Sequence, residues 1–288
     1  MTARTIGKLR SLLFVPGDRP ERFAKAAASG ADALILDLED AVAVGRKAAA
    51  RAAVAARLQA GRGEGPALFV RVNPLDGGLL AEDLAALAGF RPDGVVMPKA
   101  EGADSVRSLV AQMAAAGLAD LPLLPIVTET PAAMFRLGSY AEVGAALVGL
   151  TWGAEDLPAA IGAATSREAD GRYTPPYEMA RSLALFAAHA AEVAAIETVF
   201  PAFHDADGLA AYAARAARDG FTGMMAIHPA QVAAINAAFT PDAETVAAAA
   251  RIVAAFAAAP DAGALQIDGR MIDAPHLKQA RRILARAE

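Results

Sequence analysis

The chain has 288 residues, of which 55% are hydrophobic and 20% charged, so it can fill a large core and lacks the composition of a disordered protein. It contains no cysteine, which excludes disulfides, cysteine-ligated zinc and a cysteine nucleophile. The net charge is −5 and charges of both signs are mixed along the chain, so we expect no nucleic-acid partner.

The N-terminal segment does not have the pattern of a targeting signal. Its positive charges precede a short apolar run that ends at Pro16 and Gly17. A secretory signal needs a longer apolar core, and a membrane span needs about 20 apolar residues. The Ala-rich stretch 246–259 is too short to span and contains Arg251. We therefore expect a cytoplasmic protein that does not contact membranes.

Short apolar runs alternate with Ala-rich segments along most of the chain. Each run is continuous rather than alternating, which is typical of parallel strands that are buried on both faces. The segments between them combine good helix formers with a glycine just past the end, as a helix C-terminus prefers. The runs cover residues 11–17, 33–39, 67–73, 94–100, 121–130, 146–156, 197–203 and 223–229.

Eight strands that alternate with helices predict an α/β protein with a (β/α)8 TIM barrel over residues 1–229. The alternative is a doubly wound sheet. The sequence lacks the GxGxxG and GxxxxGK[ST] motifs that mark nucleotide-binding versions of that fold.

Residues 230–288 are predicted to form a C-terminal helical extension and lid. A first helix should end near Pro241, and Thr240 or Asp242 could cap a second one. Gly269, in the stretch "DGRMIDAPH", permits a tight turn, and a final basic helix follows. A long connection, 157–185, also interrupts the barrel pattern after the sixth strand.

Polar side chains follow seven of the eight predicted strands. In a TIM barrel the carboxyl ends of the strands form the active site, so these residues are expected to meet there. They are Asp18 and Arg19, Asp37 to Asp40, Arg71 and Asn73, Lys99, Glu129, Glu155 and Asp156, and His228.

Two of these residues are candidate metal ligands. Glu129 and Asp156 would supply hard oxygen atoms from neighbouring strands, without histidine or cysteine, which favours Mg²⁺ or Mn²⁺ over Zn²⁺. The competing interpretations are a simple helix-start acid for Glu129 and a helix N-cap for Asp156.

The other charged residues have supporting roles in this prediction. Asp37, Glu39 and Asp40 could hold the waters of a metal ion or could simply pair with cations. Arg71 could bind a carboxylate or stabilise an oxyanion, or could merely neutralise Asp37 or Glu39. Lys99 could form a Schiff base, but an ion pair with a carboxylate is the favoured interpretation.

Seven motifs, in order and with compatible spacing, carry a family resemblance over nearly the whole chain. They are "RSLLFVPGDRPERFAKA…GADALILDLEDAV…K…AR", "VRVN", "MPKAE", "PIVTET", "GAEDL", "IHPAQ" and "GRMIDAPHLKQAR". The chain resembles the citrate lyase beta subunit family, with its citryl-CoA, malyl-CoA and citramalyl-CoA lyases, within the HpcH/HpaI aldolase superfamily.

The resemblance implies a TIM barrel with a C-terminal extension, a Mg²⁺ site, and reversible Claisen cleavage of a 3-hydroxy-3-carboxyacyl thioester. Glu129 and Asp156 match the family's metal ligands, and Arg71 matches the arginine that contacts the substrate. Asp273 matches an acid that closes over the active site of a neighbouring subunit, which implies a homo-oligomer, with a trimer or a multiple of one expected.

We expect Met225 and Ala226, on the eighth predicted strand, to bind the substrate together with Arg71. The sequence departs from many relatives at Met224, where they have a lysine. If that lysine helps to hold the phosphates of CoA, either the affinity for CoA is lower here or another base, such as Arg19 or Lys25, takes the role. The expected activity is cleavage of a 3-hydroxy-3-carboxyacyl-CoA of the citryl-, malyl- or citramalyl-CoA type to an acyl-CoA and a 2-oxo acid. A thioesterase acting on a malyl-CoA-type substrate and a carrier-protein-dependent subunit are the alternatives.

Overall fold

The computed structural model describes residues 6–287 and confirms the predicted (β/α)8 barrel. Its eight strands form one sheet in the order β5-β4-β3-β2-β1-β8-β7-β6, and every paired neighbour is parallel. The strands are β1 (Ser11–Pro16), β2 (Ala33–Asp37), β3 (Ala67–Arg71), β4 (Gly94–Met97), β5 (Leu123–Pro125), β6 (Gly149–Thr151), β7 (Ala194–Glu197) and β8 (Gly223–Ala226).

The sheet closes between β5 and β6 through isolated bridges rather than a full ladder. Leu123 pairs with Leu147 and Ile126 pairs with Thr151, both in parallel. The N–H of Val127 also donates to the carbonyl oxygen of Thr151 over 2.9 Å. The closed barrel therefore brings the segments that follow β5 and β6 next to each other.

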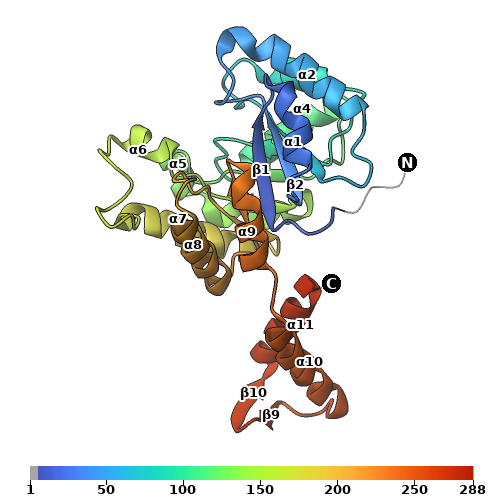
Figure 1. Cartoon of the computed structure of the whole chain (residues 1–288), viewed down its shortest axis with the longest axis vertical. Helices are drawn as coiled ribbons and strands as arrows, with labels where there is room; N and C mark the ends of the chain where they lie inside the picture. The colour runs from blue at the N-terminus through green and yellow to red at the C-terminus, as the bar shows by residue number, and fades with distance from the viewer. Residues whose placement is uncertain (1–5, 288) are drawn as a thin grey trace. The chain divides into compact units, whose positions relative to one another are not determined.

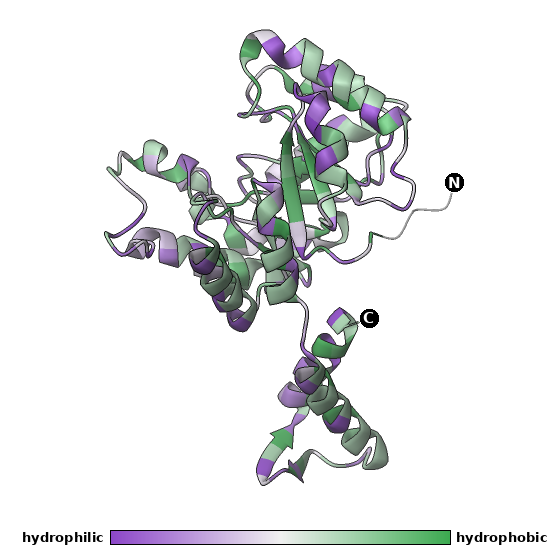
Figure 2. Ribbon diagram, in the orientation of Figure 1, coloured by the Kyte–Doolittle hydropathy of each residue, from purple (hydrophilic) through white to green (hydrophobic). Residues whose placement is uncertain are grey.

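Helices connect the strands and cover the outside of the barrel, as α1, α2 and α4 do beside β1 and β2 in Figure 1. The strands are strongly hydrophobic, whereas the helices mix polar and apolar residues (Figure 2). The helices of this part are α1 (Phe23–Ala27), α2 (Lys47–Gln59), α3 (Leu80–Leu87), α4 (Ala103–Ala115), α5 (Pro131–Met134), α6 (Asp156–Ile161), α7 (Pro175–Ala190) and α8 (Ala206–Asp219), with 3-10 helices η1 (Pro20–Arg22), η2 (Val44–Arg46), η3 (Leu137–Ala146) and η4 (Pro229–Gln231).

The barrel interior is filled by apolar side chains from most of the strands. Phe69, Ile35 and Leu124 are completely buried members of this cluster, which also contains Ile126 and Met225. The continuous apolar runs of the sequence have this origin, because each strand packs against the core on one face and against helices on the other.

One strand begins earlier than expected. The seventh run was predicted at residues 197–203, but β7 covers Ala194–Glu197 and the residues after it form a loop. Alanine has a low strand propensity, so Ala194 and Ala195 are strand residues because of their pairing with β6 rather than their intrinsic preference.

The chain divides into two compact units, Met1–Asn236 and Ala237–Glu288. Helix α9 (Val232–Phe239) crosses this boundary, and the second unit contains α10 (Ala243–Ala258), β9 (Ala264–Ile267), β10 (Arg270–Asp273) and α11 (Ala274–Ala287). The predicted cap is confirmed, because the carboxylate of Asp242 accepts a hydrogen bond from the N–H of Thr245 over 2.7 Å. None of the helices within residues 6–287 is long and apolar enough to cross a membrane.

The predicted tight turn at Gly269 joins an antiparallel hairpin, β9–β10, which the sequence analysis did not anticipate. Asp268 has φ 52° and Gly269 has φ 76°. Two consecutive left-handed residues are what a two-residue hairpin turn requires, and Asp-Gly is among its preferred sequences.

Candidate active site

A pocket of about 350 Å³ lies at the carboxyl ends of the barrel strands. It is lined by Asp37, Asp40, Arg71, Glu129, Asp156 and Met225 among the predicted site residues. Residues that follow different strands in the sequence therefore converge on one cavity, as the barrel fold requires.

Asp37 and Arg71 form the most buried ion pair of this site. They are direct partners in the register of β2 and β3, so the pairing of the strands places them side by side. Nε and Nη2 of Arg71 each donate to a different oxygen of Asp37 over 2.7 Å, which is a two-pronged carboxylate–guanidinium interaction. Burial alone lowers the pKa of Arg71, but the hydrogen bonds and charge of Asp37 outweigh it and raise the pKa, so Arg71 stays charged.

Glu39 is buried beside this pair. Nη1 of Arg71 lies 2.9 Å from Oε2 of Glu39, an ion pair whose angles do not make a hydrogen bond, and Oε1 of Glu39 accepts from the ammonium of Lys99 over 2.6 Å. Burial, ahead of the opposing charges of Arg71 and Lys99, raises the pKa of Glu39. The carboxylates after β2 are therefore paired with cations, while a role in holding metal-bound water stays a prediction.

Lys99 connects three carboxylates. Its ammonium lies 2.6 Å from Glu39, 3.3 Å from Asp156 and 3.5 Å from the exposed Asp40. Burial alone lowers the pKa of Lys99, but the hydrogen bond to Glu39 and the surrounding carboxylates outweigh it and raise the pKa above its usual value. A protonated amine is not a nucleophile, so the geometry favours the ion pair over a Schiff base.

The backbone of Lys99 also shapes the site. Its φ is 50°, in the left-handed region that side chains rarely adopt. In this conformation its N–H donates to Oε2 of Glu129 over 2.6 Å. Lys99 thus contacts one candidate metal ligand through its backbone and the other, Asp156, through its side chain.

Glu129 is almost completely buried, with 4% of its surface exposed. Burial raises its pKa to about 8, and the charges of Asp156 and Glu39 act in the same direction against the hydrogen bond from Lys99. The N-cap of the following helix is Thr130, whose side chain accepts from the N–H of Ala133, so Glu129 is not the helix-start acid of the competing interpretation.

Asp156 is the first residue of α6 and is partly exposed to the pocket. The N-cap of this helix is Glu155, without a side-chain hydrogen bond, so the competing N-cap interpretation of Asp156 is wrong. Gly153 makes room for the pair of acids, because a Cβ there would lie 2.8 Å from Cγ of Glu129.

The two predicted substrate-binding residues of β8 differ in position. Met225 lines the pocket, whereas Ala226 is completely buried and is absent from the lining. Met224 is also completely buried and does not line the pocket. Arg22, at the end of η1, lines it and is exposed.

Asp273 ends β10 and belongs to the second unit. Its Oδ1 lies 2.5 Å from Nδ1 of His276, in the first turn of α11. The proposed action of Asp273 on a neighbouring subunit stays a prediction.

Glu197 is a buried acid that the sequence analysis did not identify. It is the last residue of β7, so a polar side chain stands at the end of each of the eight strands or in the segment that follows it. It accepts hydrogen bonds from the side chains of Trp152, Arg181 and Tyr212. The apolar run in the sequence predicts a strand that begins at Glu197, whereas β7 ends there, so this acid does not stand out as a strand-end residue in the sequence.

A second missed group supports the loop after β2. The ammonium of Lys47 donates to the carbonyl oxygens of Leu38 and Glu39 and to Oδ1 of Asn73. The sequence feature that could have identified this group is a lysine at the start of an otherwise Ala-rich predicted helix. Lys47 fixes the backbone that places Glu39 beside Arg71 and Asp40 in the pocket lining.

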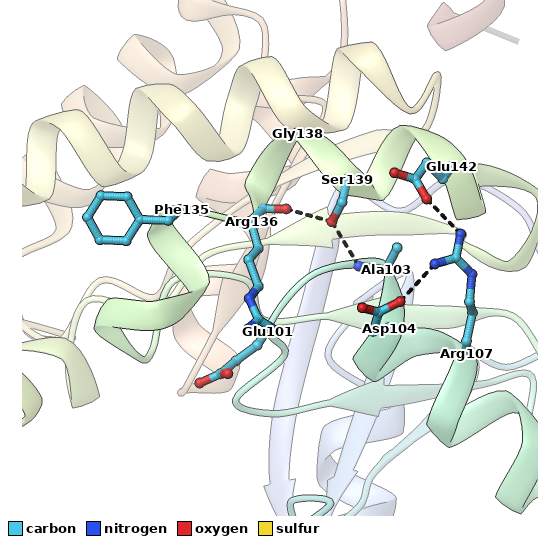
Figure 3. Close-up of a pocket in the computed structure, with 9 residues that line it drawn as sticks. All are labelled: Glu101, Ala103, Asp104, Arg107, Phe135, Arg136, Gly138, Ser139 and Glu142. Atoms are coloured by element: carbon cyan, nitrogen blue, oxygen red, sulfur yellow. Dashed lines mark hydrogen bonds and ion pairs between the residues drawn. The ribbon is translucent and has the colours of Figure 1, made fainter.

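Two other pockets lie in the described part of the barrel unit. One, of about 340 Å³, is bordered by Glu101, Arg107, Phe135 and Glu142, and its Arg107 lies between Asp104 and Glu142 (Figure 3). The other, of about 510 Å³, lies between the 167–173 loop, the 200–205 loop and α8. None of the predicted site residues lines either pocket, so neither is the candidate active site.

Known proteins resemble the chain over nearly its whole length. A citrate lyase subunit beta-like protein of Mycobacterium tuberculosis is 40% identical over 96% of this chain and 94% of its own. A (3S)-malyl-CoA thioesterase of Cereibacter sphaeroides is 34% identical over 97% of this chain and 94% of its own. The crystal structure of CitE from M. tuberculosis in complex with magnesium, acetoacetate and coenzyme A is 38% identical, with a TM-score of 0.79, over 98% of this chain and 99% of CitE.

The model of the family described as HpcH/HpaI aldolase/citrate lyase matches residues 10–229, which contain every strand of the barrel and the whole pocket lining. Apart from "GRMIDAPHLKQAR", which lies outside the matched residues, the motifs that carry the resemblance are the segments that build the site. The chain belongs to the HpcH/HpaI aldolase/citrate lyase family.

Proposed function

We propose that the chain is a Mg²⁺-dependent carbon–carbon lyase. It cleaves a 3-hydroxy-3-carboxyacyl-CoA of the citryl-, malyl- or citramalyl-CoA type to an acyl-CoA and a 2-oxo acid by reversible Claisen chemistry. The observation that carries the proposal is the meeting of two carboxylates, Glu129 and Asp156, with the charged Arg71 in one pocket. A related CitE structure contains magnesium, acetoacetate and coenzyme A.

The donor set fits Mg²⁺. Glu129 is buried with its pKa raised, so its negative charge is unfavourable there unless a cation offsets it. Within residues 6–287 no group of three histidine, cysteine, aspartate or glutamate side chains is placed to hold a metal ion. Two protein carboxylates leave positions for water and substrate oxygens, as is usual for Mg²⁺.

The residues of the chain then have distinct roles. When bound, Mg²⁺ supplies a Lewis acid for the oxygens of the 2-oxo acid portion. Arg71 offsets negative charge on oxygen as the carbon–carbon bond breaks. During cleavage the 3-hydroxyl loses its proton as it becomes the carbonyl of the 2-oxo acid, and Asp273 of a neighbouring subunit returns one proton to the α-carbon of the thioester; during condensation Asp273 removes that proton. The active form is therefore a homo-oligomer, a trimer or a multiple of one.

Two alternative functions use the same site. A thioesterase would hydrolyse a malyl-CoA-type substrate, and the similarity to a (3S)-malyl-CoA thioesterase favours this candidate. A carrier-protein-dependent subunit of a citrate lyase complex would be inactive alone on free acyl-CoA. Hydrolysis releases free CoA without forming a 2-oxo acid, so measuring both products separates the lyase from the thioesterase.

The test combines metal removal with two ligand variants. EDTA should abolish cleavage and added Mg²⁺ should restore it, while Glu129→Gln and Asp156→Asn should each lose Mg²⁺-supported turnover and remain folded. Asp104→Asn removes an acid that lies outside this pocket and is the matched control. Full activity of either ligand variant in EDTA would refute the metal role.

A further inference from the structure

The floor of the candidate active site is apolar. Phe14, Ile126, Val199 and Met225 all line the pocket. Ile126 and Met225 belong to the buried cluster that fills the barrel, and Phe14 and Val199 pack against the same cluster. The floor is therefore the upper layer of the barrel core, and none of these four side chains can form an ion pair.

Negative charge predominates among the ionisable groups of the lining. Among the described residues, the carboxyl side chains of the lining are Asp37, Asp40, Glu129, Glu155 and Asp156, and its cationic side chains are Arg22 and Arg71. Lys99 does not line the pocket, and its ammonium is paired with Glu39, Asp40 and Asp156. A substrate that brings several negative charges into this pocket needs a cation for each of them, because an unpaired carboxylate is costly to bury.

The positive charge of Arg71 is already largely offset by two carboxylates of the protein. Two of its nitrogens donate to Asp37, and the third lies 2.9 Å from Glu39. Its guanidinium also lies over the ring of Phe14, with 4.8 Å between Cζ and the ring centroid. Arg22 is exposed, on the solvent side of the lining rather than among the floor residues.

This inference rests on the proposed function and refines its substrate. In that function the cation held by Glu129 and Asp156, together with Arg71, serves the carboxylate and the carbonyl oxygen that every 2-oxo acid has. We propose that the third substituent of the 2-oxo acid portion faces the apolar floor and is hydrogen or a small alkyl group, not a second carboxylate.

The pocket then selects malyl-CoA- or citramalyl-CoA-type thioesters and rejects the citryl-CoA type. In citryl-CoA the 2-oxo acid portion is oxaloacetate, whose additional carboxylate would meet either the apolar floor or the acids around it. We expect this mismatch to lower kcat/KM for citryl-CoA by a factor on the order of 100 or more relative to citramalyl-CoA.

The experiment measures kcat/KM for cleavage of malyl-, citramalyl- and citryl-CoA by the full chain with Mg²⁺, following acyl-CoA and 2-oxo acid together. Cleavage of the first two and weak cleavage of citryl-CoA is the expected result. Citryl-CoA within tenfold of citramalyl-CoA would overturn the inference and leave the proposed function intact. Failure to form a 2-oxo acid from any of the three would instead refute the proposed function.

Variants of the floor residues test the same inference through a change in substrate selectivity. The result then does not depend on how active the wild-type protein is toward each substrate. Met225→Lys and, separately, Val199→Lys place a cation on the floor, and each folded variant should shift the ratio of citryl-CoA to citramalyl-CoA cleavage at least tenfold toward citryl-CoA. Met225→Leu keeps the floor apolar and is the matched control, with an unchanged ratio. An unshifted ratio in both folded lysine variants would overturn the inference.

Arg22→Met tests the exposed cation of the lining. The selectivity should persist in this variant, because Arg22 is not expected to bind the third substituent. A selective loss of citryl-CoA cleavage in Arg22→Met would show that the pocket does provide a partner for a second carboxylate, and the inference would be wrong.

Discussion

The substitution Gly153→Ala should displace the side chain of Glu129, a candidate metal ligand, and the structure gives the size of that displacement. A Cβ at position 153 would lie 2.8 Å from Cγ and 3.2 Å from Oε1 of Glu129, whereas ordinary contact begins near 3.4 Å. The backbone of Gly153 is fixed, since its N–H donates to Oγ1 of Thr128 and its carbonyl oxygen accepts from the same hydroxyl. Glu129 must therefore move, by roughly 0.6 Å for the Cγ contact alone.

A displacement of this size exceeds the tolerance of about 0.2 Å that metal-ligand distances allow. Losses of well-oriented ligand support typically cost 10- to 100-fold in metal affinity, so we expect Gly153→Ala to weaken Mg²⁺ binding by about that factor. Calorimetric titration with Mg²⁺ measures the affinity directly, and thermal unfolding with and without Mg²⁺ reports the same loss as a smaller stabilisation by the ion.

Gly138→Ala is the matched control, because a Cβ at that position would have no neighbour within 4 Å. It should bind Mg²⁺ as the wild type does. Wild-type Mg²⁺ affinity in a folded Gly153→Ala protein would refute the reasoning, since it would mean that the carboxylate of Glu129 either does not move or does not hold the ion.

Arg71→Lys keeps the charge but loses the planar fork that matches Asp37, and kcat should fall by on the order of 10²-fold; a raised KM with unchanged kcat would show that Arg71 only binds substrate. The raised pKa of Glu129, about 8, means that a proton occupies the carboxyl below that pH without metal, so apparent Mg²⁺ affinity should rise by roughly tenfold per pH unit from 6 to 8 and then level off. Calorimetry across this range checks it, and a flat profile would contradict it. Asp273→Ala and Glu129→Gln subunits, each inactive alone, should regain activity when they exchange, because hybrid sites contain both residues. Confirmed exchange without activity would show that Asp273 does not act across an interface.

Much of the fold was readable from the sequence because buried parallel strands leave a simple signal. A continuous apolar run that ends in a polar residue marks the carboxyl end of a barrel strand, and this pattern identified Arg71, Glu129 and Asp156 as residues that line one pocket. This pattern does not identify β7. Three of its four residues, Ala194, Ala195 and Glu197, are weak strand formers, whereas the loop after them contains valine and phenylalanine.

The part of the site that could not be predicted depends on backbone conformation and on distant partners. The left-handed φ of Lys99 points its N–H at Glu129, and lysine carries no propensity for that conformation. The pairing of Arg71 with Asp37 and Glu39 follows from strand register and burial, which no local pattern encodes. Sequence reasoning therefore found the residues but left open which charges were already balanced.

The ion pair of Asp37 with Arg71 makes the assembly of the candidate active site depend on the correct register of the barrel strands. The two residues are 34 positions apart and meet only when β2 and β3 align in one register. A slip of one residue would turn Arg71 toward the helices and leave a carboxylate unmatched in the interior. A misaligned register would thus bury an uncompensated charge and be less stable than the correct one. The charged residues of the candidate active site therefore favour the strand alignment that brings them together.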